Sequence, residues 1–327
     1  MRYRRLGKTG YLVSEIGFGA WALGGQWGRI DDSASLRALH GAADAGVNFF
    51  DTADVYGDGR SERIIGRFLG ERRGEPLIVA TKIGRRAPLE MASYTRVHFR
   101  EWVDRSRENL GVASLDLVQL HCLPTDVYYQ PETFDWLEEL KVEGAISNYG
   151  VSIARVEEGL KAIEYPGVAV IQVIFNIFRQ RPAERLLPAA RSADVGVVAR
   201  IPLASGLLTG KLRQETVFDA DDHRAFNRHG EAFDVGETFA GVGFEQGLAA
   251  VERVRPLVPN DLTMAQFALR WVLMNHAVST VIPGARDAAQ AQANAKASDV
   301  PEITPSAMDA LAALYRDEIA PTVHHRW

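Results

Sequence analysis

The stretch SASLRALHGAADAGVNFFD, residues 33–51, has the residue spacing of a helix followed directly by the pattern of a strand. The helical spacing is carried by Leu36, Leu39, His40 and Ala43. Ser33 stands where a helix cap is expected and Gly46 where the helix should stop, which predicts a helix over 33–45. VNFFD then has the pattern of a buried strand ending at Asp51. A helix and a strand in this order form the repeating step of an α/β fold.

The same step recurs along the chain. Strands are predicted around Ile16–Ala20 and in PLIVATK, LDLVQLH, AISNYGVS, AVIQVI, VGVVAR and VSTVI. Helices are predicted over 61–70, 97–110, 132–142, 153–164, 183–193, 263–275 and 287–297. Regular alternation requires a parallel sheet covered by helices, and eight βα units close a (β/α)8 TIM barrel. We therefore predict an α/β barrel in preference to an open sheet.

Two segments lie outside the alternation. YRRLGKTGYLV predicts an N-terminal β-hairpin with GKTG as its turn. The segment 203–245, after the seventh strand, is rich in Gly, Asp, His and Phe. A loop of this length is either a functional cover or a disordered excursion, and its phenylalanines favour a cover. The length of 327 residues is compatible with two domains, but barrels of this size form one, so 1–327 is taken as a single domain.

Composition narrows the function classes. The chain is 46% hydrophobic and 24% charged, with a formal net charge of −5. Mild acidity without a basic run gives nucleic acid or an anionic membrane little electrostatic attraction. No apolar run reaches the roughly 18 residues of a spanning helix, and no secretory signal is visible at the N-terminus. The lone Cys122 forms no internal disulfide, so a cytoplasmic location is expected.

Titratable side chains gather where the predicted strands end. Asp51, Lys82 and His121 end strands two, three and four, and Tyr56 follows in the loop FDTADVYGDGRSE. Active sites of barrels lie at this edge. Taken singly, Asp51 is explained by capping, Lys82 by a solvated strand end, His121 by a core histidine and Tyr56 by packing. Their arrival on consecutive strand ends favours a shared function.

The four groups have the chemistry of a proton donor. A phenol has a pKa near 10, so a neighbouring lysine cation is needed to stabilise its phenolate, with Asp51 balancing the lysine. His121 can hydrogen-bond a substrate carbonyl. No nucleophile with a base and no metal-ligand spacing accompanies them, so a metal site is not expected. A carbonyl that takes a proton from tyrosine also needs a hydride, which a nicotinamide cofactor supplies.

FDTADVYGDGRSERIIG resembles the signature of the aldo-keto reductases. GFGAWALGG, ATKIG, LVQLH, VIQVIFNIF, PLASGLLTGK and VIPGAR occur in family order, so the likeness covers nearly the whole chain. It implies the barrel, NAD(P)H dependence and a catalytic tetrad at Asp51, Tyr56, Lys82 and His121. A cytoplasmic, NADPH-preferring reductase of aldehydes and ketones follows, with NADH the weaker cofactor.

The resemblance also implies a cofactor site. It places Ser152, Gln172 and Asn176 near the nicotinamide carboxamide and Gly284 and Asn294 near the adenosine end. Along the pyrophosphate it places Pro202, Leu203, Ser205, Gly206, Leu208 and Lys211. The frame that matches the fifth strand is GVSI, so Ile153 replaces an asparagine and Ser147–Asn148 is a false match.

Two further positions depart from the family pattern. Arg200 stands where many relatives carry an aromatic that stacks on the nicotinamide; a guanidinium can stack in its place, or Arg200 is only a charged strand end. Gln290 stands where many relatives carry an arginine for the 2′-phosphate. Arg286 at the start of the last helix can take over that contact, because a helix N-terminus and a guanidinium suit a phosphate, or it is a plain surface residue.

Two other functions stay open. One is a non-catalytic, cofactor-binding regulatory subunit, as in the channel-associated β subunits that resemble these enzymes. The other is a barrel aldolase that forms a Schiff base through Lys82. Trp21 and Trp27 near the mouth predict an apolar or aromatic substrate pocket, unless they only pack. The physiological carbonyl substrate and the oligomeric state are not readable from the sequence.

Overall fold

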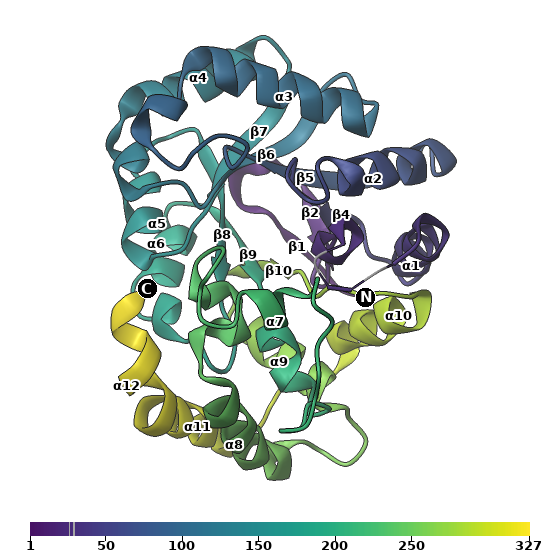
Figure 1. Ribbon diagram of the computed structural model, residues 1–327, viewed down its shortest axis with the longest axis vertical. Coiled ribbons are helices and arrows are strands. Elements are labelled where there is room, and N and C mark those ends of the chain that lie inside the picture. Colours follow the sequence, from purple (N-terminus) through teal and green to yellow (C-terminus); the bar gives the residue numbers. More distant parts are fainter. Residues whose placement is uncertain (26, 29) are drawn as a thin grey trace.

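The computed structural model describes residues 1–25, 27–28 and 30–327. Figure 1 shows the strands at the centre of the molecule and the helices around them. The strands are β1 (Tyr3–Arg5), β2 (Leu12–Ser14), β3 (Phe18–Gly19), β4 (Phe49–Asp51), β5 (Ile78–Ile83), β6 (Leu115–His121), β7 (Ile146–Ser152), β8 (Val168–Ile174), β9 (Gly196–Arg200) and β10 (Val278–Val281).

Strands β3 to β10 form a closed parallel barrel. They pair in chain order, each parallel to the next. Parallel bridges from Ile16 to Val281 and from Gly19 to Gly284 join the first strand to the last. The predicted eight-stranded barrel is confirmed. Where β5 pairs with β6, Lys82 lies opposite Gln119, so the carboxyl ends of these strands lie at the same end of the barrel.

Helices cover the barrel from outside (Figure 1). They are α1 (Asp32–Asp44), α2 (Arg60–Glu71), α3 (Arg96–Leu110), α4 (Pro131–Val142), α5 (Val156–Ala162), α6 (Leu186–Ser192), α7 (His223–Phe226), α8 (Phe244–Val254), α9 (Met264–Leu273), α10 (Ala288–Ala295), α11 (Pro305–Leu314) and α12 (Ala320–Val323). Each barrel strand is followed by a helix, and β9 and β10 are each followed by three. Helices α7, α8, α11 and α12 lie outside the predicted elements.

Three predicted helix starts are wrong, and one of these is α6, which begins at Leu186 and not at 183. Helix α1 is capped by Asp31 and not by Ser33, because the Asp31 carboxylate accepts the backbone N–H of Ala34 at 2.7 Å. A carboxylate at this position also interacts favourably with the helix dipole. Helix α5 begins at Val156 and not at 153, because the Glu158 carboxylate accepts the backbone N–H groups of Ala154 and Arg155 and holds them outside the helix.

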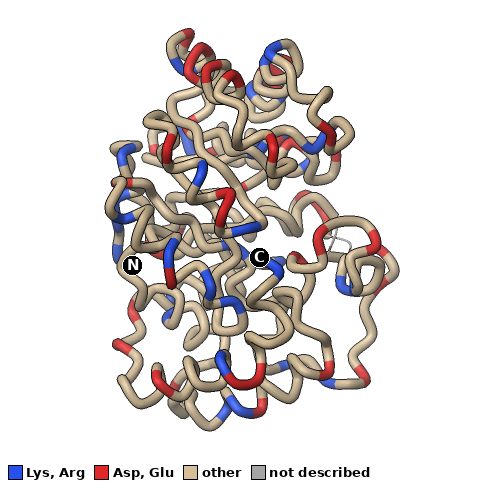
Figure 2. The backbone as a smooth tube through the Cα atoms, turned by 90° about the vertical axis from the view of Figure 1, so that its left-hand side faces the viewer, with Lys and Arg blue, Asp and Glu red and all other residues tan. Residues whose placement is uncertain are grey.

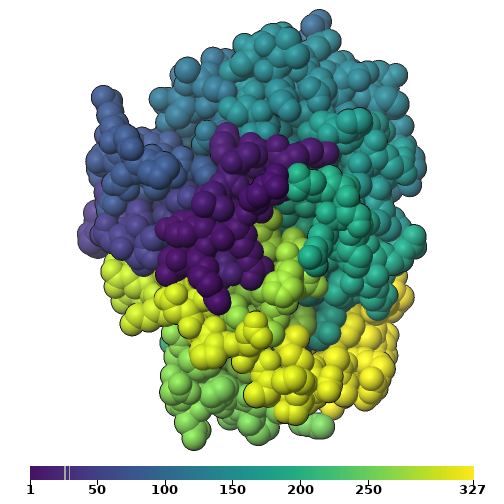
Figure 3. All heavy atoms as spheres, turned by 180° about the vertical axis from the view of Figure 1, so that it is seen from behind, coloured from purple at the N-terminus to yellow at the C-terminus, as the bar shows by residue number. Residues whose placement is uncertain are grey.

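The N-terminal hairpin closes the end of the barrel opposite the aligned strand ends. Strands β1 and β2 pair antiparallel, and Figure 3 shows the hairpin in purple across the rear face. Lys8 N–H donates to the carbonyl of Asp194 just before β9, and Arg4 donates to the carbonyl of Val278 in β10. Beneath it, the barrel interior is filled by Leu6, Val13, Phe49, Ile78, Ala80, Leu117, Ala169, Val170, Val198 and Ile282.

The long segment between β9 and α8 packs as a cover. It contains the short helical turns η6 (Ala204–Thr209), α7, η7 (Val235–Glu237) and η8 (Phe239–Gly241). Phe239 contacts both Phe218 and Phe244, at ring centroid distances of 6.1 and 5.0 Å. In Figure 1 this green segment lies in front of the strands, so it stands over the open end of the barrel.

Charge is distributed without a dominant sign. Figure 2 shows basic and acidic residues interspersed along the backbone. Within residues 1–25, 27–28 and 30–327, no helix has the length and apolar character needed to cross a membrane.

Candidate active site

The four tetrad candidates meet at the carboxyl-terminal ends of three neighbouring strands. Asp51 ends β4, Lys82 lies near the end of β5, and His121 ends β6. Lys82 Nζ donates to Asp51 Oδ2 at 2.5 Å and to the Tyr56 hydroxyl at 3.3 Å. His121 meets Tyr56 edge-on, with ring centroids 5.8 Å apart. The structure therefore brings all four side chains into one cluster.

Asp51 is held by two amides from the barrel interior. Its Oδ1 accepts from Gln172 Nε2 at 2.6 Å and from Gln119 Nε2 at 3.3 Å. The side chains of Lys82 and Asp51 are 1% and 4% exposed, so this pair is fully inside the protein. Gln119 was not among the predicted site residues. Its spacing of two from His121 along a strand is the signal that places both on one face.

The electrostatics of the cluster keep the phenol neutral and the lysine charged. Burial raises the pKa of the Tyr56 phenol, although Lys82 acts in the opposite direction. Burial opposes the charge on Lys82, but Asp51 and Tyr56 together raise the pKa of Lys82 above its usual value. Lys82 thus acts on Tyr56 in the predicted direction, while burial decides the net shift. At neutral pH Tyr56 carries the proton that a general acid must hold.

His121 is a neutral imidazole. Burial, with the cations Arg85, Lys82 and Arg200, holds the pKa of His121 well below its usual value. Its Nδ1 is buried and has no hydrogen-bond partner in the part of the chain that the structure describes. The chain turns sharply after His121, because Cys122 has a φ of 49° and donates its N–H to the carbonyl of Ser152. A neutral ring held in this way can donate one N–H to a carbonyl oxygen.

Glycine allows the loop of Tyr56 to lie against the first βα loop. A Cβ on Gly24 would meet the backbone N of Gly57 and the backbone C of Tyr56, both at 2.8 Å. Gly57 itself has a φ of 61°. Such close backbone contact is possible only without a side chain, so Gly24 helps to place Tyr56.

Aromatic rings wall the mouth of the site. Trp21 stacks on Tyr56 with centroids 6.2 Å apart, and Trp27 meets Trp21 edge-on at 5.6 Å. The cover contributes His223, whose ring lies 4.6 Å from Trp21 and 4.4 Å from Trp27, and Phe233, at 5.9 Å from Trp21. Trp21 and Trp27 therefore lie at the mouth and pack there as well.

A second charged group lies next to the tetrad. Glu237 Oε1, from the cover, lies 3.3 Å from Arg85 Nη2 and 3.9 Å from Arg200 Nη1. Arg200 also donates to the carbonyl of Ile153 at 3.2 Å and to Cys122 Sγ at 3.4 Å. Arg85 and Glu237 were not among the predicted site residues, because Glu237 arrives from a segment without periodicity. Arg200 is buried and bonded, so its description as a plain charged strand end does not hold.

The side chains predicted to lie near the nicotinamide form hydrogen bonds within the protein. Ser152 ends β7 and its hydroxyl donates to Gln172 Oε1 at 3.4 Å. Asn176 donates to the carbonyl of Ile201 and accepts from the N–H of Phe178, so both ends of its amide are in use. Ser152 and Gln172 thus lie beside Asp51, whereas Asn176 stabilises the turn after β8.

The candidate pyrophosphate segment has an unusual backbone. Positive φ angles occur at Ile201, Ala204, Ser205, Gly206 and Gly210. Pro202, Leu203 and Leu208 lie within the same turn region, and Lys211 follows it with an exposed side chain. Successive left-handed residues turn backbone N–H groups into concavities that suit anions. The side chain of Ser205 is already in use. Its buried hydroxyl donates to the Glu237 carbonyl and accepts from the N–H of Phe239.

The candidate phosphate site at the start of helix α10 is formed by local contacts. Asp287 caps α10, and Gln290 Oε1 accepts the backbone N–H of Arg286 at 3.1 Å. Asn294 donates to the carbonyl of Gly284 at 3.1 Å. A Cβ on Gly28 would lie 3.7 Å from Arg286 Nη2, so the first βα loop reaches Arg286. The exposed side chain of Arg286 therefore lies between the first βα loop and the start of α10.

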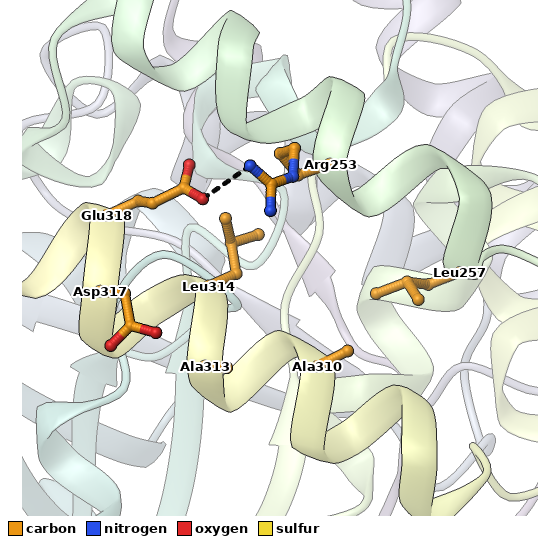
Figure 4. Close-up of a pocket in the computed structure, with 7 residues that line it drawn as sticks. All are labelled: Arg253, Leu257, Ala310, Ala313, Leu314, Asp317 and Glu318. Carbon is orange, nitrogen blue, oxygen red and sulfur yellow. Dashed lines mark ion pairs between the residues drawn. The ribbon is translucent and has the colours of Figure 1, made fainter.

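A cavity lies away from the strand ends and contains none of the candidate site residues. It has a volume of ≈ 340 Å³, lies between α8 and α11, and its lining is drawn in Figure 4: Arg253, Leu257, Ala310, Ala313, Leu314, Asp317 and Glu318. Arg253 and Glu318 form an ion pair across it at 3.0 Å. Among the described residues no cluster of three or more His, Cys, Asp or Glu side chains is arranged to hold a metal ion.

Comparison with known proteins assigns the chain to a family. The model of the aldo/keto reductase family matches residues 15–316, and the chain belongs to that family. A probable voltage-gated potassium channel subunit beta of Oryza sativa subsp. japonica is 30% identical, with 100% of each chain covered. The NADH-specific methylglyoxal reductase of Escherichia coli is 27% identical over 90% of this chain and 93% of its own. The holo form of aldo-keto reductase AKR11C1 from Bacillus halodurans has a TM-score of 0.78 and 28% identity, covering 96% of both chains.

The protein is an NAD(P)H-dependent oxidoreductase of this family. A dinucleotide needs cations and anion-binding turns for its phosphates. Lys211 and Arg286 are cations on the two candidate segments, and residues 201–210 include five with the positive φ that such turns use. Ser152 and Gln172 offer polar atoms beside the tetrad. The residues present therefore fit such a cofactor.

Proposed function

We propose that this enzyme reduces aldehydes and ketones to alcohols, with Tyr56 as the general acid. The proposal rests on one observation: the Asp51–Lys82–Tyr56 hydrogen-bonded chain faces a neutral His121 at the strand ends. These groups supply a proton and a hydrogen bond to a carbonyl oxygen. When bound, the nicotinamide cofactor supplies the hydride that the carbonyl carbon gains.

Each side chain has a separate role in this reaction. Tyr56 holds the transferable proton, and Lys82 stabilises the phenolate that remains after the proton leaves. Asp51 fixes Lys82, and Gln119 and Gln172 fix Asp51. In the reduction one proton passes from the Tyr56 hydroxyl to the carbonyl oxygen, and a water proton restores the phenol afterwards. The aromatic wall excludes bulk water, which strengthens these interactions.

NADPH is proposed as the preferred cofactor, because Arg286 lies at the N-terminus of α10. A guanidinium there offers charge-assisted hydrogen bonds to a 2′-phosphate. The name of the E. coli relative describes an NADH-specific enzyme, so family membership alone does not set the preference. The proposal depends on Arg286 and not on Gln290, which is neutral and bonded to the Arg286 backbone.

The two other functions have less support. An aldolase needs a neutral lysine amine, but Asp51 and Tyr56 raise the pKa of Lys82 despite its burial, and its ammonium is paired. The name of the rice relative describes a channel subunit, which keeps a regulatory role as the alternative for this chain. Turnover distinguishes the two.

The test is NADPH oxidation with short aldehydes, aromatic aldehydes, methylglyoxal and sugars. We expect turnover of at least one carbonyl class and no protein adduct after borohydride treatment. No turnover with any class, in a protein that binds NADPH, would favour the regulatory subunit. A substrate-dependent borohydride adduct at Lys82 would favour the aldolase.

A further inference from the structure

One carboxylate is shared by a partly buried and a buried arginine beside the four-residue cluster. Arg85 and Arg200 both reach the same oxygen, Glu237 Oε1, at 3.3 and 3.9 Å. The side chains of Arg85, Arg200 and Glu237 are 17%, 10% and 9% exposed. Only the shorter of the two contacts is a hydrogen bond. Glu237 therefore neutralises one guanidinium well and the other poorly.

The charges around the site do not balance. Lys82 is paired with Asp51, and His121 is neutral, so these groups contribute no net charge. Two arginines then stand against one glutamate, which leaves an excess of one positive charge. The Nε atoms of Arg85 and Arg200 are buried and have no hydrogen-bond partner among the described residues. An uncompensated buried cation is costly unless an anion completes it.

Glu237 is fixed where it stands. Its backbone carbonyl accepts from the hydroxyl of Ser205, which in turn accepts the N–H of Phe239. Three residues before Glu237, the Asp234 carboxylate accepts from the indole N–H of Trp327 at 2.9 Å. The backbone is anchored on both sides of Glu237, and within residues 1–25, 27–28 and 30–327 no other carboxylate pairs with Arg85 or Arg200.

The excess charge lies within reach of the reacting groups. Arg85 follows Lys82 by three positions at the end of β5. Arg85 and Arg200 both act on His121, and Glu237 acts on Tyr56, closely enough to shift the pKa of each ring. Arg85 is the more exposed of the two arginines, so it is the better placed of the two to meet a ligand from solvent.

We propose that Arg85, supported by Arg200, binds an anionic group of the substrate. The preferred substrates are then small oxo acids, in which a carboxylate lies a few atoms from the carbonyl. This rests on the proposed carbonyl reduction. The carboxylate completes the charge of the two guanidinium groups while the carbonyl oxygen meets Tyr56 and His121. The phosphates of the cofactor do not compete, because their proposed partners, Lys211 and Arg286, lie on other segments.

Matched pairs of substrates test this. Pyruvate is compared with methyl pyruvate, and 4-oxobutanoate with methyl 4-oxobutanoate, so that each pair differs by one charge and the pairs differ in reach. We expect kcat/KM for the acid to exceed that for the ester at least roughly tenfold in one pair. Arg85→Met should reduce the acid-to-ester ratio about 10- to 150-fold.

Further variants separate charge from structure. Arg85→Lys keeps the charge and should retain part of the ratio, whereas Glu237→Gln removes the internal carboxylate and should raise it. Arg96→Met is the matched control, because Arg96 is paired with Glu139 on the surface and is 61% exposed. It should leave the ratio unchanged. An ester preference in the wild type, or an equal ratio in Arg85→Met, would overturn the proposal.

A binding measurement keeps the test independent of turnover. Oxamate, an unreactive carboxylate, is titrated against the cofactor-loaded protein by tryptophan fluorescence, which Trp21 and Trp27 at the mouth report. Arg85→Met should weaken oxamate binding about tenfold or more. Equal binding to both proteins contradicts the anion site. If esters and neutral aldehydes are reduced but no carboxylate effect is found, the anion site fails alone; if nothing is reduced, the proposed function fails.

Discussion

Lys82 Nζ lies 3.3 Å from the Tyr56 hydroxyl and 2.5 Å from Asp51 Oδ2, so one buried ammonium joins the acid to its counter-ion. The hydrogen bonds therefore run in one line, from Asp51 through Lys82 to Tyr56. Asp51 keeps Lys82 charged, and the charge of Lys82 would favour the phenolate that the proposed proton transfer creates. The pair is buried, so removal of one member affects both stability and catalysis.

Lys82→Met is expected to lower kcat about 100-fold or more, because the phenolate loses its cation. The free energy of unfolding should fall by about 3–5 kcal/mol, since Asp51 is left without its charged partner. Adding Asp51→Asn to this variant should recover part of the stability and none of the activity. Urea unfolding and steady-state rates measure the two effects. Wild-type rates in Lys82→Met would remove lysine from the mechanism.

The buried carboxyl of Asp54 predicts a pH dependence of stability. Burial, with Glu62, raises the pKa of Asp54 from 3.8 to about 7, although Arg86 and Arg105 oppose this. Both of its oxygens lack a hydrogen-bond partner in the described residues. The folded state therefore holds a proton that the unfolded chain releases near pH 4. This contribution is full below about pH 4 and is lost as the pH rises to about 7.

Asp54→Asn is expected to remove that dependence. Between pH 4 and 8 the wild type should lose up to roughly 4 kcal/mol more stability than the variant does. Urea unfolding of both proteins across this range provides the measurement. Parallel curves would mean that Asp54 is not protonated in the folded state near neutrality.

Arg286→Ala is expected to weaken NADPH binding about 10- to 150-fold while NADH binding changes little, because NADH lacks the 2′-phosphate. Titration of both reduced cofactors by fluorescence quenching tests this. Equal wild-type affinities, or a variant that loses both cofactors alike, would show that Arg286 does not contact the phosphate.

Gly24→Ala is expected to reduce activity by displacing Tyr56, because its Cβ would press on the backbone of Tyr56 and Gly57 at 2.8 Å. Gly70→Ala is the matched control. Gly70 lies in α2, and a Cβ there would meet no neighbouring atom within 4 Å, so alanine should add about 0.5–1 kcal/mol of stability. Unchanged kcat in Gly24→Ala would show that this contact does not place the tyrosine.

The barrel, and the meeting of the four candidate side chains at one end of it, were predictable for a simple reason. The alternation of helix and strand periods fixes where each strand ends, and Asp51, Lys82 and His121 lie at those ends. Gln119 could also have been predicted, because it precedes His121 by two positions on a strand and so lies on the same face. The contacts of Arg85 and Glu237 were not, since Glu237 comes from the aperiodic cover and its position depends on tertiary contacts. Ser205 illustrates the same limit: its motif indicates a cofactor contact, whereas its hydroxyl donates to the backbone carbonyl of Glu237 within the cover.

The central claim is that Tyr56 donates the proton. Tyr56→Phe removes only the hydroxyl, so the stack with Trp21 and the fold should persist. The decisive measurement is kcat together with the dissociation constant for NADPH in this variant. We predict a fall in kcat of roughly 100- to 10,000-fold with nearly unchanged NADPH affinity. A loss of less than about tenfold in kcat would contradict the assignment of Tyr56 as the general acid.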